Sequence, residues 1–303
     1  MIVAAANPAI DRLLELDRLV TGEIYEPGGA LEVAGGKALN VARSAHVLGA
    51  HVHAVALLGG LNGQRVSAML EADGIPFDPV QTGGETRQTL AVLARDSGQL
   101  TQFYERGTEQ AARGFSRFRE RVLERCGVGE WLVLSGSLPA GVNPALTGEL
   151  AAEGRRLGAN VAVDQHGPWL AASLGAAPSL IKVNEEEAHE LTGLAPRGAV
   201  RELRLRAAGA RVVVTMGTDG ALLLDGSDLW HGVLDTRGAY STGCGDAFLG
   251  GMVASLQAAP GRWVDALGLG LAAATANALV PGPARFERDT AMALAGEVRL
   301  TRV

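Results

Sequence analysis

The stretch from residue 131 to residue 163 reads WLVLSGSLPAGVNPALTGELAAEGRRLGANVAV. Its first four residues form a short apolar run, which predicts a buried strand at 131–134. Residues 144–157 carry apolar side chains at three-and-four spacing, which predicts a helix, and a second apolar run predicts a strand at 160–163. A strand, a covering helix and a second strand form the unit from which parallel sheets are built, so this stretch predicts an α/β fold.

The same alternation extends in both directions from this stretch. Further strands are predicted at 180–183 and 211–215, further helices at 185–192 and 200–208, and the alternation is also present at 37–53 and 63–73.

Two segments, at about 12–34 and 86–106, instead have the pattern of strands without helices between them. We expect them to form an antiparallel flap that acts as a lid, with a plain edge hairpin as the alternative. The whole chain, 1–303, is therefore predicted to be one α/β domain with a mostly parallel central sheet and a small β lid.

Composition and charge narrow the class of function. The 303 residues are 47% hydrophobic and 20% charged, and the net charge is −6 with both signs interspersed. No run of like charges is long enough for a nucleic-acid arm or a membrane patch, so neither partner is expected. The N-terminus has no cationic lead, no stretch is apolar enough to span a membrane, and two cysteines are too few for a disulfide framework. These features indicate a cytoplasmic protein.

The segment STGCGDAFLGGM, residues 241–252, carries the strongest chemical signal. The small residues Gly243, Cys244 and Gly245 permit a sharp turn into a helix, where backbone N–H groups and the positive helix end face one point and attract phosphate. Asp246 would then lie beside an anion site, as a base for a hydroxyl that is being phosphorylated. The alternative is an acidic residue that only stabilises the helix dipole.

A second glycine-rich turn, GGKALNVAR at residues 35–43, also leads into a predicted helix. Its paired glycines permit close approach of the backbone to a ligand, Lys37 supplies a point charge, and Asn40 lies one turn further on with a donor and an acceptor. The spacing fits neither a Walker A loop nor a dinucleotide fingerprint. An ordinary helix start is the alternative for this segment.

These two turns are part of a series of segments that resembles the PfkB carbohydrate kinases over essentially the whole chain. The resemblance is to the branch that contains 1-phosphofructokinase, tagatose-6-phosphate kinase and the minor 6-phosphofructokinase. The other matching segments are NPAID at 7–11, TRQT at 86–89, LSGSLPAG at 134–141, IKVNEEE at 181–187 and VTMGTDGA at 214–221. The resemblance implies a ribokinase-like, three-layer αβα fold, ATP and Mg²⁺ as cofactors, a sugar or sugar phosphate as substrate, and a homodimer formed through the lid.

The resemblance also implies roles for individual residues. Asp246 would be the general base, with Gly243, Cys244 and Gly245 as an anion hole for the transferred phosphoryl group. Asn184 and Glu187 would organise Mg²⁺ through water, with ordinary surface polar residues as the alternative. The implied nucleotide contacts are Lys182, Asn184, Thr215, Gly217 and Gly220. The implied sugar contacts are Asp11, Gly36, Lys37, Asn40, Arg87, Ser137 and, from the lid, Arg106, which is equally compatible with a solvated position.

The sequence departs from the family pattern in two ways. Ala38, Val183 and Cys244 stand where the family has glycine, proline and alanine, which are small changes that keep the backbone roles. Tyr25 and Glu26 stand where members that bind sugar phosphates have a cationic element on the lid.

The expected acceptor is nevertheless a sugar phosphate, of the fructose 1-phosphate, tagatose 6-phosphate or fructose 6-phosphate type. Lys37 and Arg87 persist, and together they would take a phosphate already on the substrate. An unphosphorylated sugar or a nucleoside is the alternative acceptor. A non-catalytic, sugar-binding regulatory protein is the third hypothesis, and the presence of Asp246, Asn184 and Glu187 argues against it.

Overall fold

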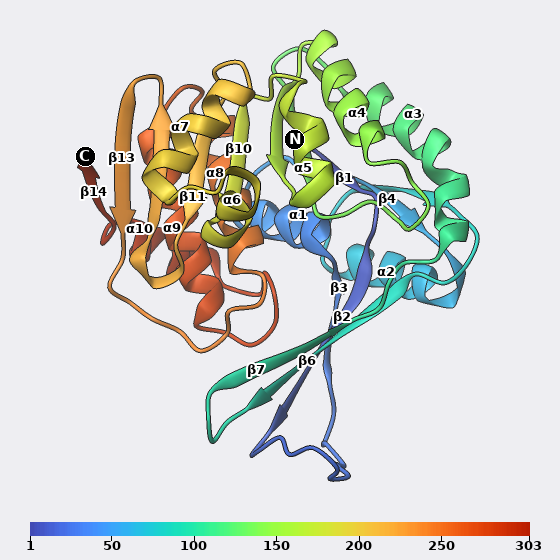
Figure 1. Cartoon of the computed structure of the whole chain (residues 1–303). Helices are drawn as coiled ribbons and strands as arrows, with labels where there is room; N and C mark the ends of the chain where they lie inside the picture. The colour runs from blue at the N-terminus through green and yellow to red at the C-terminus, as the bar shows by residue number, and fades with distance from the viewer.

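The computed structural model describes the backbone of residues 1–303 and the side chains of residues 1–109 and 113–303. Its largest feature is a ten-stranded sheet with helices on both faces, and a separate four-stranded sheet projects from this body (Figure 1). The strands of the large sheet are, in spatial order, β14 (Arg299–Arg302), β13 (Asp228–Val233), β12 (Ala221–Asp225), β11 (Arg211–Thr215), β10 (Leu180–Asn184), β9 (Asn160–Asp164), β8 (Trp131–Ser135), β1 (Ile2–Ala5), β4 (His53–Leu58) and β5 (Phe77–Gln81).

The strands from β11 to β5 run parallel to one another. Helices cover both faces of this part of the sheet, so its strands are apolar throughout, and every residue of β8 is buried. The strands predicted at 131–134, 160–163, 180–183 and 211–215 are confirmed. At one edge, β12, β13 and β14 pair antiparallel, which the sequence analysis did not predict.

A layer of helices lies on each face of the large sheet (Figure 1). One layer contains α1 (Lys37–Val47), α2 (Gly60–Ala72), α8 (Cys244–Ala258), α9 (Trp263–Ala278) and α10 (Arg288–Ala295). The other contains α3 (Phe115–Arg125), α4 (Ala145–Arg156), α5 (Gly167–Leu174), α6 (Glu185–Thr192) and α7 (Pro196–Arg206). Alternate strand residues feed the two cores, as in β8, where Val133 packs in one core and Leu132 and Leu134 in the other. The predicted three-layer αβα fold is therefore confirmed.

The helix boundaries follow local signals. The predicted helix at 185–192 matches α6, and the one at 144–157 matches α4 with one residue less at each end. α7 begins at Pro196, ahead of the predicted start at 200, because proline is well accommodated in the first turn of a helix. No helix in the part of the chain that the structure describes is long and apolar enough to cross a membrane.

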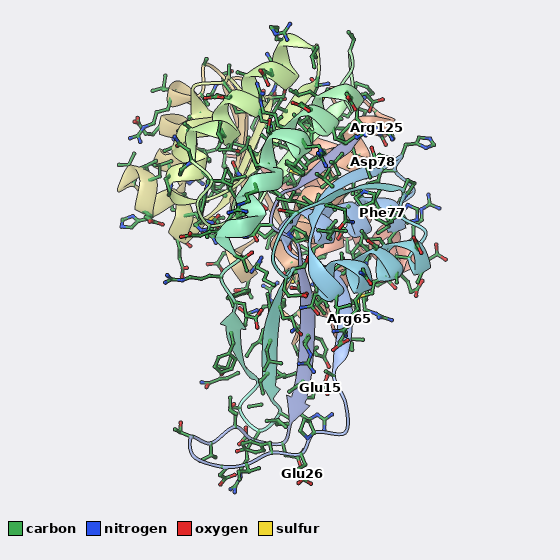
Figure 2. All side chains as sticks on the ribbon, turned by 90° about the vertical axis from the view of Figure 1, so that its right-hand side faces the viewer. Glu15, Glu26, Arg65, Phe77, Asp78 and Arg125 are labelled. Atoms are coloured by element: carbon green, nitrogen blue, oxygen red, sulfur yellow. The ribbon has the colours of Figure 1, made fainter. Side chains whose placement is uncertain are left out.

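The four-stranded sheet is formed, in order, by β3 (Leu31–Gly35), β2 (Ala9–Leu16), β6 (Arg87–Ala94) and β7 (Gln99–Tyr104). We call this sheet, together with residues 17–30 at its outer end, the lid; Figure 2 shows Glu15 and Glu26 on it. β2 pairs antiparallel with β3, and β6 with β7. The expectation of an antiparallel flap was wrong at the centre, where β2 and β6 pair parallel, because both strands leave the body in the same direction.

Candidate active site

A cleft of about 1360 Å³ lies between the carboxyl ends of the parallel strands and the lid. The structure brings all of the predicted site residues to this cleft. They come from the lid and α1 (Asp11, Gly36, Lys37, Asn40, Arg87, Arg106), from the segment after β8 (Ser137), from β10 and α6 (Lys182, Asn184, Glu187), from β11 and the turn after it (Thr215, Gly217, Gly220), and from the start of α8 (Gly243, Cys244, Gly245, Asp246).

The turn into α8 depends on two of its glycines. Gly243 precedes the helix with φ +79°, in the left-handed region, and a Cβ there would lie 2.6 Å from Cβ of Pro283. Gly245 lies against Lys182, since a Cβ on Gly245 would be 2.8 Å from the lysine Nζ. In the first turn of α8 the N–H of Cys244 donates to the carbonyl oxygen of Ser241 at 3.3 Å, whereas the N–H groups of Gly245 and Asp246 have no partner within the helix and lie near this ammonium group.

Cys244 is held by hydrogen bonds within this turn. Its thiol donates to the carbonyl oxygen of Tyr240 at 3.3 Å and accepts from Nδ2 of Asn277 at 3.4 Å. Burial raises the pKa of the Cys244 thiol to about 11, although the Asn277 hydrogen bond opposes the shift. A neutral, packed thiol fits the role of a small residue in the turn better than that of a nucleophile.

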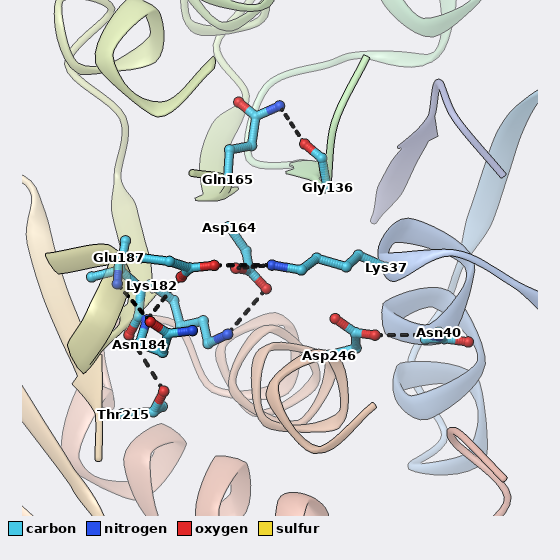
Figure 3. Close-up of polar contacts among 11 residues, drawn as sticks. Lys37, Asn40, Gly136, Asp164, Gln165, Lys182, Asn184, Glu187, Thr215 and Asp246 are labelled. Carbon is cyan, nitrogen blue, oxygen red and sulfur yellow. Dashed lines mark hydrogen bonds and ion pairs between the residues drawn. The ribbon is translucent and has the colours of Figure 1, made fainter. Parts of the chain in front are cut away.

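Asp246 lies in the first turn of α8 and is 6% exposed. Nδ2 of Asn40, from α1, donates to Oδ2 of Asp246 at 3.0 Å (Figure 3). Burial raises the pKa of Asp246 to about 7, and the negative charge of Asp164 acts in the same direction. Lys37, the Asn40 hydrogen bond and Lys182 oppose this shift. A carboxyl group that titrates near neutral pH is suited to accept a proton from a hydroxyl group.

Asp164, which the sequence analysis missed, lies at the centre of the charged groups. It is the last residue of β9 and is fully buried. Nζ of Lys182 lies 3.2 Å from its Oδ2, and Nζ of Lys37 lies 3.8 Å from its Oδ1. Asp164 directly follows the strand predicted at 160–163, so a polar residue ending an apolar run was the signal that could have identified it.

Lys37 reaches from the start of α1 across to the opposite side of the cleft (Figure 3). Its Nζ donates to Oε1 of Glu187 at 3.2 Å. The charge of Asp164, followed by that of Glu187, raises the pKa of the Lys37 ammonium above its usual value although burial opposes this. Lys37 is therefore a permanent cation in contact with the residues at the start of α6.

Asn184 and Glu187 form a capping box at the N-terminus of α6. Oδ1 of Asn184 accepts from the backbone N–H of Glu187 at 2.7 Å, and Oε2 of Glu187 accepts from that of Asn184 at 2.9 Å. These bonds occupy part of the oxygen set that a directly bound cation would need. Among the side chains that the structure describes, no group of three or more His, Cys, Asp or Glu residues could hold a metal ion. Because the capping box already uses one oxygen of each side chain, the pair fits water-mediated contact with Mg²⁺ carried by a nucleotide.

The turn after β11 forms the rim of the cleft next to α6. Thr215 ends the strand, and its hydroxyl donates to the carbonyl oxygen of Val183 at 3.4 Å. Gly217 begins a short 3₁₀ turn, η2 (Gly217–Asp219), with φ +56°. Gly220 has φ +84°, and a Cβ there would lie 2.0 Å from the carbonyl oxygen of Gly232, so this turn requires glycine.

Asp11 is the central polar residue at the base of the lid. Its Oδ2 accepts from the N–H of Gly36 at 3.0 Å and from Nδ2 of Asn40 at 3.3 Å. Its Oδ1 accepts from the hydroxyl of Thr89, which lies opposite it on β6, at 2.7 Å. Because Asn40 also binds Asp246, it links the carboxylate of the lid to that of α8.

Arg87 starts β6 and forms the outer part of the same region. Its Nη2 donates to the carbonyl oxygen of Asn7 at 3.2 Å, and Nδ2 of Asn7 donates in turn to the hydroxyl of Ser137 at 2.9 Å. Asn7 is a further residue that no role was predicted for, although it belongs to the NPAID segment. Arg106 is exposed and lines the cleft where the chain leaves the lid.

Two hydrogen bonds join the lid to the loop that precedes α8. The hydroxyl of Tyr240 donates to Oε1 of Glu15 at 2.9 Å, and Nε2 of Gln102 donates to the hydroxyl of Thr242 at 3.0 Å. The Tyr240 ring also packs against a small apolar cluster on the lid that includes Leu13. The lid therefore contacts the loop that leads into the first turn of α8.

The profile of the pfkB family of carbohydrate kinases matches residues 4–290. The chain belongs to this family. The 1-phosphofructokinase of Xanthomonas campestris pv. campestris is 32% identical over 266 residues, covering 84% of this chain and 83% of that protein. The ATP-dependent 6-phosphofructokinase isozyme 2 of Escherichia coli K12 is 32% identical over 277 residues, covering 89% and 87%.

A solved structure shows that the fold of this chain is also shared. The crystal structure of phosphofructokinase-2 from Escherichia coli in complex with potassium superimposes with a TM-score of 0.89 at 27% identity, covering 97% of both chains. The predicted family, branch and fold are confirmed, and the chain is a carbohydrate kinase that uses ATP as the phosphoryl donor. The roles of its individual residues stay predictions.

Proposed function

We propose that this kinase transfers the γ-phosphoryl group of ATP to a hydroxyl group of a sugar phosphate and yields a bisphosphate. The observation that carries the proposal is the position of Asp246, a buried carboxyl group at the meeting point of the anion hole and the acceptor side of the cleft. Asn40 bonds both to Asp246 and to Asp11, so the proposed base and the proposed sugar contact share one partner. The names of the relatives, a 1-phosphofructokinase and a 6-phosphofructokinase, support a sugar phosphate as acceptor.

In the proposed reaction the acceptor oxygen attacks the γ-phosphorus atom while the bond to the ADP oxygen breaks. The hydroxyl proton passes to the carboxylate of Asp246, whose pKa of about 7 leaves a large ionised fraction at neutral pH. The first-turn amides of α8 and the ammonium group of Lys182 face the oxygens of the migrating group. Residues of the lid would exclude water, which otherwise competes as acceptor.

We assign Asn184 and Glu187 to Mg²⁺ on the nucleotide, with water between the cation and their side chains. The cation would neutralise charge on the β- and γ-phosphates. The hydrogen bond from Lys37 to Glu187 orients the carboxylate at this point. Because this bond and Asp164 draw Lys37 to the nucleotide side, we place Lys37 beside the transferred phosphoryl group and not, as expected from the sequence, with Arg87 at the phosphate of the acceptor.

The phosphate already present on the acceptor would then be bound chiefly by Arg87, with Arg106 beside it. Arg87 is half-buried on the acceptor side, where Asp11 acts on it electrostatically. Glu26, the acidic departure from the family pattern, lies on the lid away from the main body (Figure 2), so its charge does not oppose a phosphate at Arg87.

The test measures ADP release with fructose 1-phosphate, fructose 6-phosphate and tagatose 6-phosphate, and with an unphosphorylated hexose and a nucleoside. We expect turnover with a sugar phosphate and a rise of about 30-fold or more in its KM in Arg87→Ala, because a hydrogen bond to a charged group contributes about 2 kcal/mol. Arg125→Ala is the control, since Arg125 pairs with Asp78 on the main body.

The other hypotheses have different outcomes in the same assay. Turnover restricted to an unphosphorylated acceptor, with no effect of Arg87→Ala on KM, would favour a kinase of neutral sugars or nucleosides. Failure to release ADP with any acceptor would favour a non-catalytic sugar-binding protein and would overturn the proposal.

We also propose that two copies associate through the lid and that the protein acts in the cytoplasm. The lid exposes the apolar side chains of Ile24 (94% exposed) and Phe103 (56%), which a second copy would cover. The thiols of Cys126 and Cys244 are free, which suits a reducing compartment. Light scattering should find a dimer in solution and a monomer for the variant that combines Ile24→Lys and Phe103→Lys; an unchanged dimer would contradict this assignment.

A further inference from the structure

We propose that Asp164 is a positioning residue for phosphoryl transfer, which holds Lys37 and Lys182 so that both ammonium groups face the migrating phosphoryl group. The inference rests on the proposed function, because it assigns Lys37 and Lys182 to the transferred group. Asp164 itself would not touch the substrate, since its side chain is fully buried.

The contacts of Asp164 join three elements of the fold. Asp164 is the last residue of β9. Lys182 reaches its carboxylate from β10, and Lys37 reaches it from the start of α1 (Figure 3). The distances are 3.2 Å to Nζ of Lys182 and 3.8 Å to Nζ of Lys37. One carboxylate thus lies between two cations that approach from different elements.

The same contacts fix where the two ammonium groups lie. Nζ of Lys182 is confined between Asp164 and Gly245, where even a methyl group on the glycine would be 2.8 Å from the nitrogen. Nζ of Lys37 is confined between Asp164 and Glu187, the residue at the proposed Mg²⁺ position. The lysines therefore reach the two flanks of the site, one at the anion hole and one at the nucleotide end.

A buried ammonium group that lies near a second cation needs a counter-charge. Lys182 is 3% exposed, and without Asp164 its ammonium group would lose its nearest anion while Lys37 still repels it. Oδ1 of Asp164 makes no hydrogen bond and is buried. That oxygen faces the ammonium group of Lys37 across 3.8 Å, so the lysine supplies the positive charge that balances it.

The experiment compares the wild type with Asp164→Asn and with the control Asp225→Asn, which removes a carboxylate paired with Arg211 in the same sheet but outside this cleft. We expect Asp164→Asn to lower kcat by about 10²-fold, the scale for losing one charge-stabilising contact, and to change the KM of the acceptor less than about threefold. The control should retain wild-type values.

The pH profile provides a second readout. The groups that interact with Asp246 are Lys37 and Asn40 from α1, Asp164 from β9, Lys182 from β10, Tyr104 from β7 and Cys244 from α8 itself. Removing the negative charge of Asp164 favours ionisation of Asp246, so the acidic limb of kcat/KM should move to lower pH in Asp164→Asn. A residue that only supports the fold would lower the amount of active enzyme and leave this limb in place.

Three results for Asp164→Asn would overturn the inference. The first is a kcat within about threefold of wild type, and the second is an unmoved acidic limb of kcat/KM. The third is full recovery of the rate at high Mg²⁺, which would make Asp164 a metal ligand. Asp164→Glu covers the case in which the asparagine variant melts below the assay temperature. The glutamate keeps the negative charge but moves it by the length of one methylene group. We therefore expect kcat to fall at least tenfold while the acidic limb of kcat/KM stays in place. A wild-type kcat would overturn the inference. An inactive wild type would instead overturn the proposed function.

Discussion

Replacing Asp246 by asparagine should remove catalysis and make the protein more stable. The amide oxygen of the new side chain can still accept the hydrogen bond from Asn40, so the local geometry is kept. The amide cannot accept the proton of the acceptor hydroxyl group. We therefore expect kcat to fall by about 10²- to 10⁴-fold, the usual cost of losing a general base.

The gain in stability follows from burial of the carboxylate. The pKa of Asp246 is about 7 in the folded protein, against 3.8 for an unperturbed aspartate, so the folded state binds the proton more tightly than the unfolded chain. The free energy of unfolding must then decrease as pH rises from about 4 to about 7, and stay lower above that range. A gap of about 3 pH units corresponds to about 4 kcal/mol at pH 8, and asparagine avoids this cost.

Urea unfolding at pH 5 and at pH 8.5 measures this difference, with ADP release measured on the same preparations. The free energy of unfolding of Asp246→Asn should exceed that of wild type by about 1.5 kcal/mol at pH 5, where only the unfolded aspartate is ionised, and by about 4 kcal/mol at pH 8.5. Asp235→Asn is the control, because Asp235 is exposed and pairs with Arg299 on the surface.

Two results would refute the reasoning. A rate near wild type would remove Asp246 from the mechanism. A loss of stability in Asp246→Asn at pH 8.5 would mean that the carboxylate acts on the helix dipole, the alternative that the sequence left open, since that interaction stabilises the ionised form.

Three further predictions concern the surroundings of Asp246. Gly245→Ala should lower kcat at least tenfold with little change in thermal unfolding, because its methyl group would displace the Nζ of Lys182, and a wild-type kcat would contradict the proposed anion hole. Tyr240→Phe should raise the KM of the acceptor about fivefold and increase ATP hydrolysis without acceptor, since it removes the hydrogen bond to Glu15 on the lid; unchanged values would exclude a role for this contact. Cys244, with a pKa of about 11, should react with iodoacetamide at pH 8 at least tenfold more slowly than an unperturbed thiol, as mass spectrometry can follow, and fast alkylation would contradict the buried position.

The parts of the fold that could be predicted are those with a strong local pattern. Strands such as β8 are buried on both faces, so their sequence is a continuous apolar run that needs no tertiary information. The pairing of β2 with β6 could not be predicted in this way, because a strand sequence does not encode the direction of its neighbour. The antiparallel edge was missed for a related reason, since β14 is short and mostly exposed.

The same distinction between local sequence pattern and tertiary packing applies to the site residues. The residues around Gly243 and Lys37 were found because a turn into a helix has a sequence signature of small residues. Asp164 has only the weaker signature of a polar residue at the end of an apolar run, and its partners are two lysines that only the packing of α1 and β10 brings to it. The capping box of Asn184 and Glu187 has a sequence signature, but only the structure revealed how many of their oxygens it uses.

The pairing of β2 with β6 has a consequence for how the chain acquires its structure. Between these strands the chain runs through β3, α1, β4, α2 and β5, so the pairing of β2 with β6 at the centre of the lid closes a long loop. Loop closure of this kind is slow, and it requires the elements of that loop to be arranged beforehand. The pocket for the acceptor should therefore be completed late in folding, and amide hydrogen exchange should find it the first region to open.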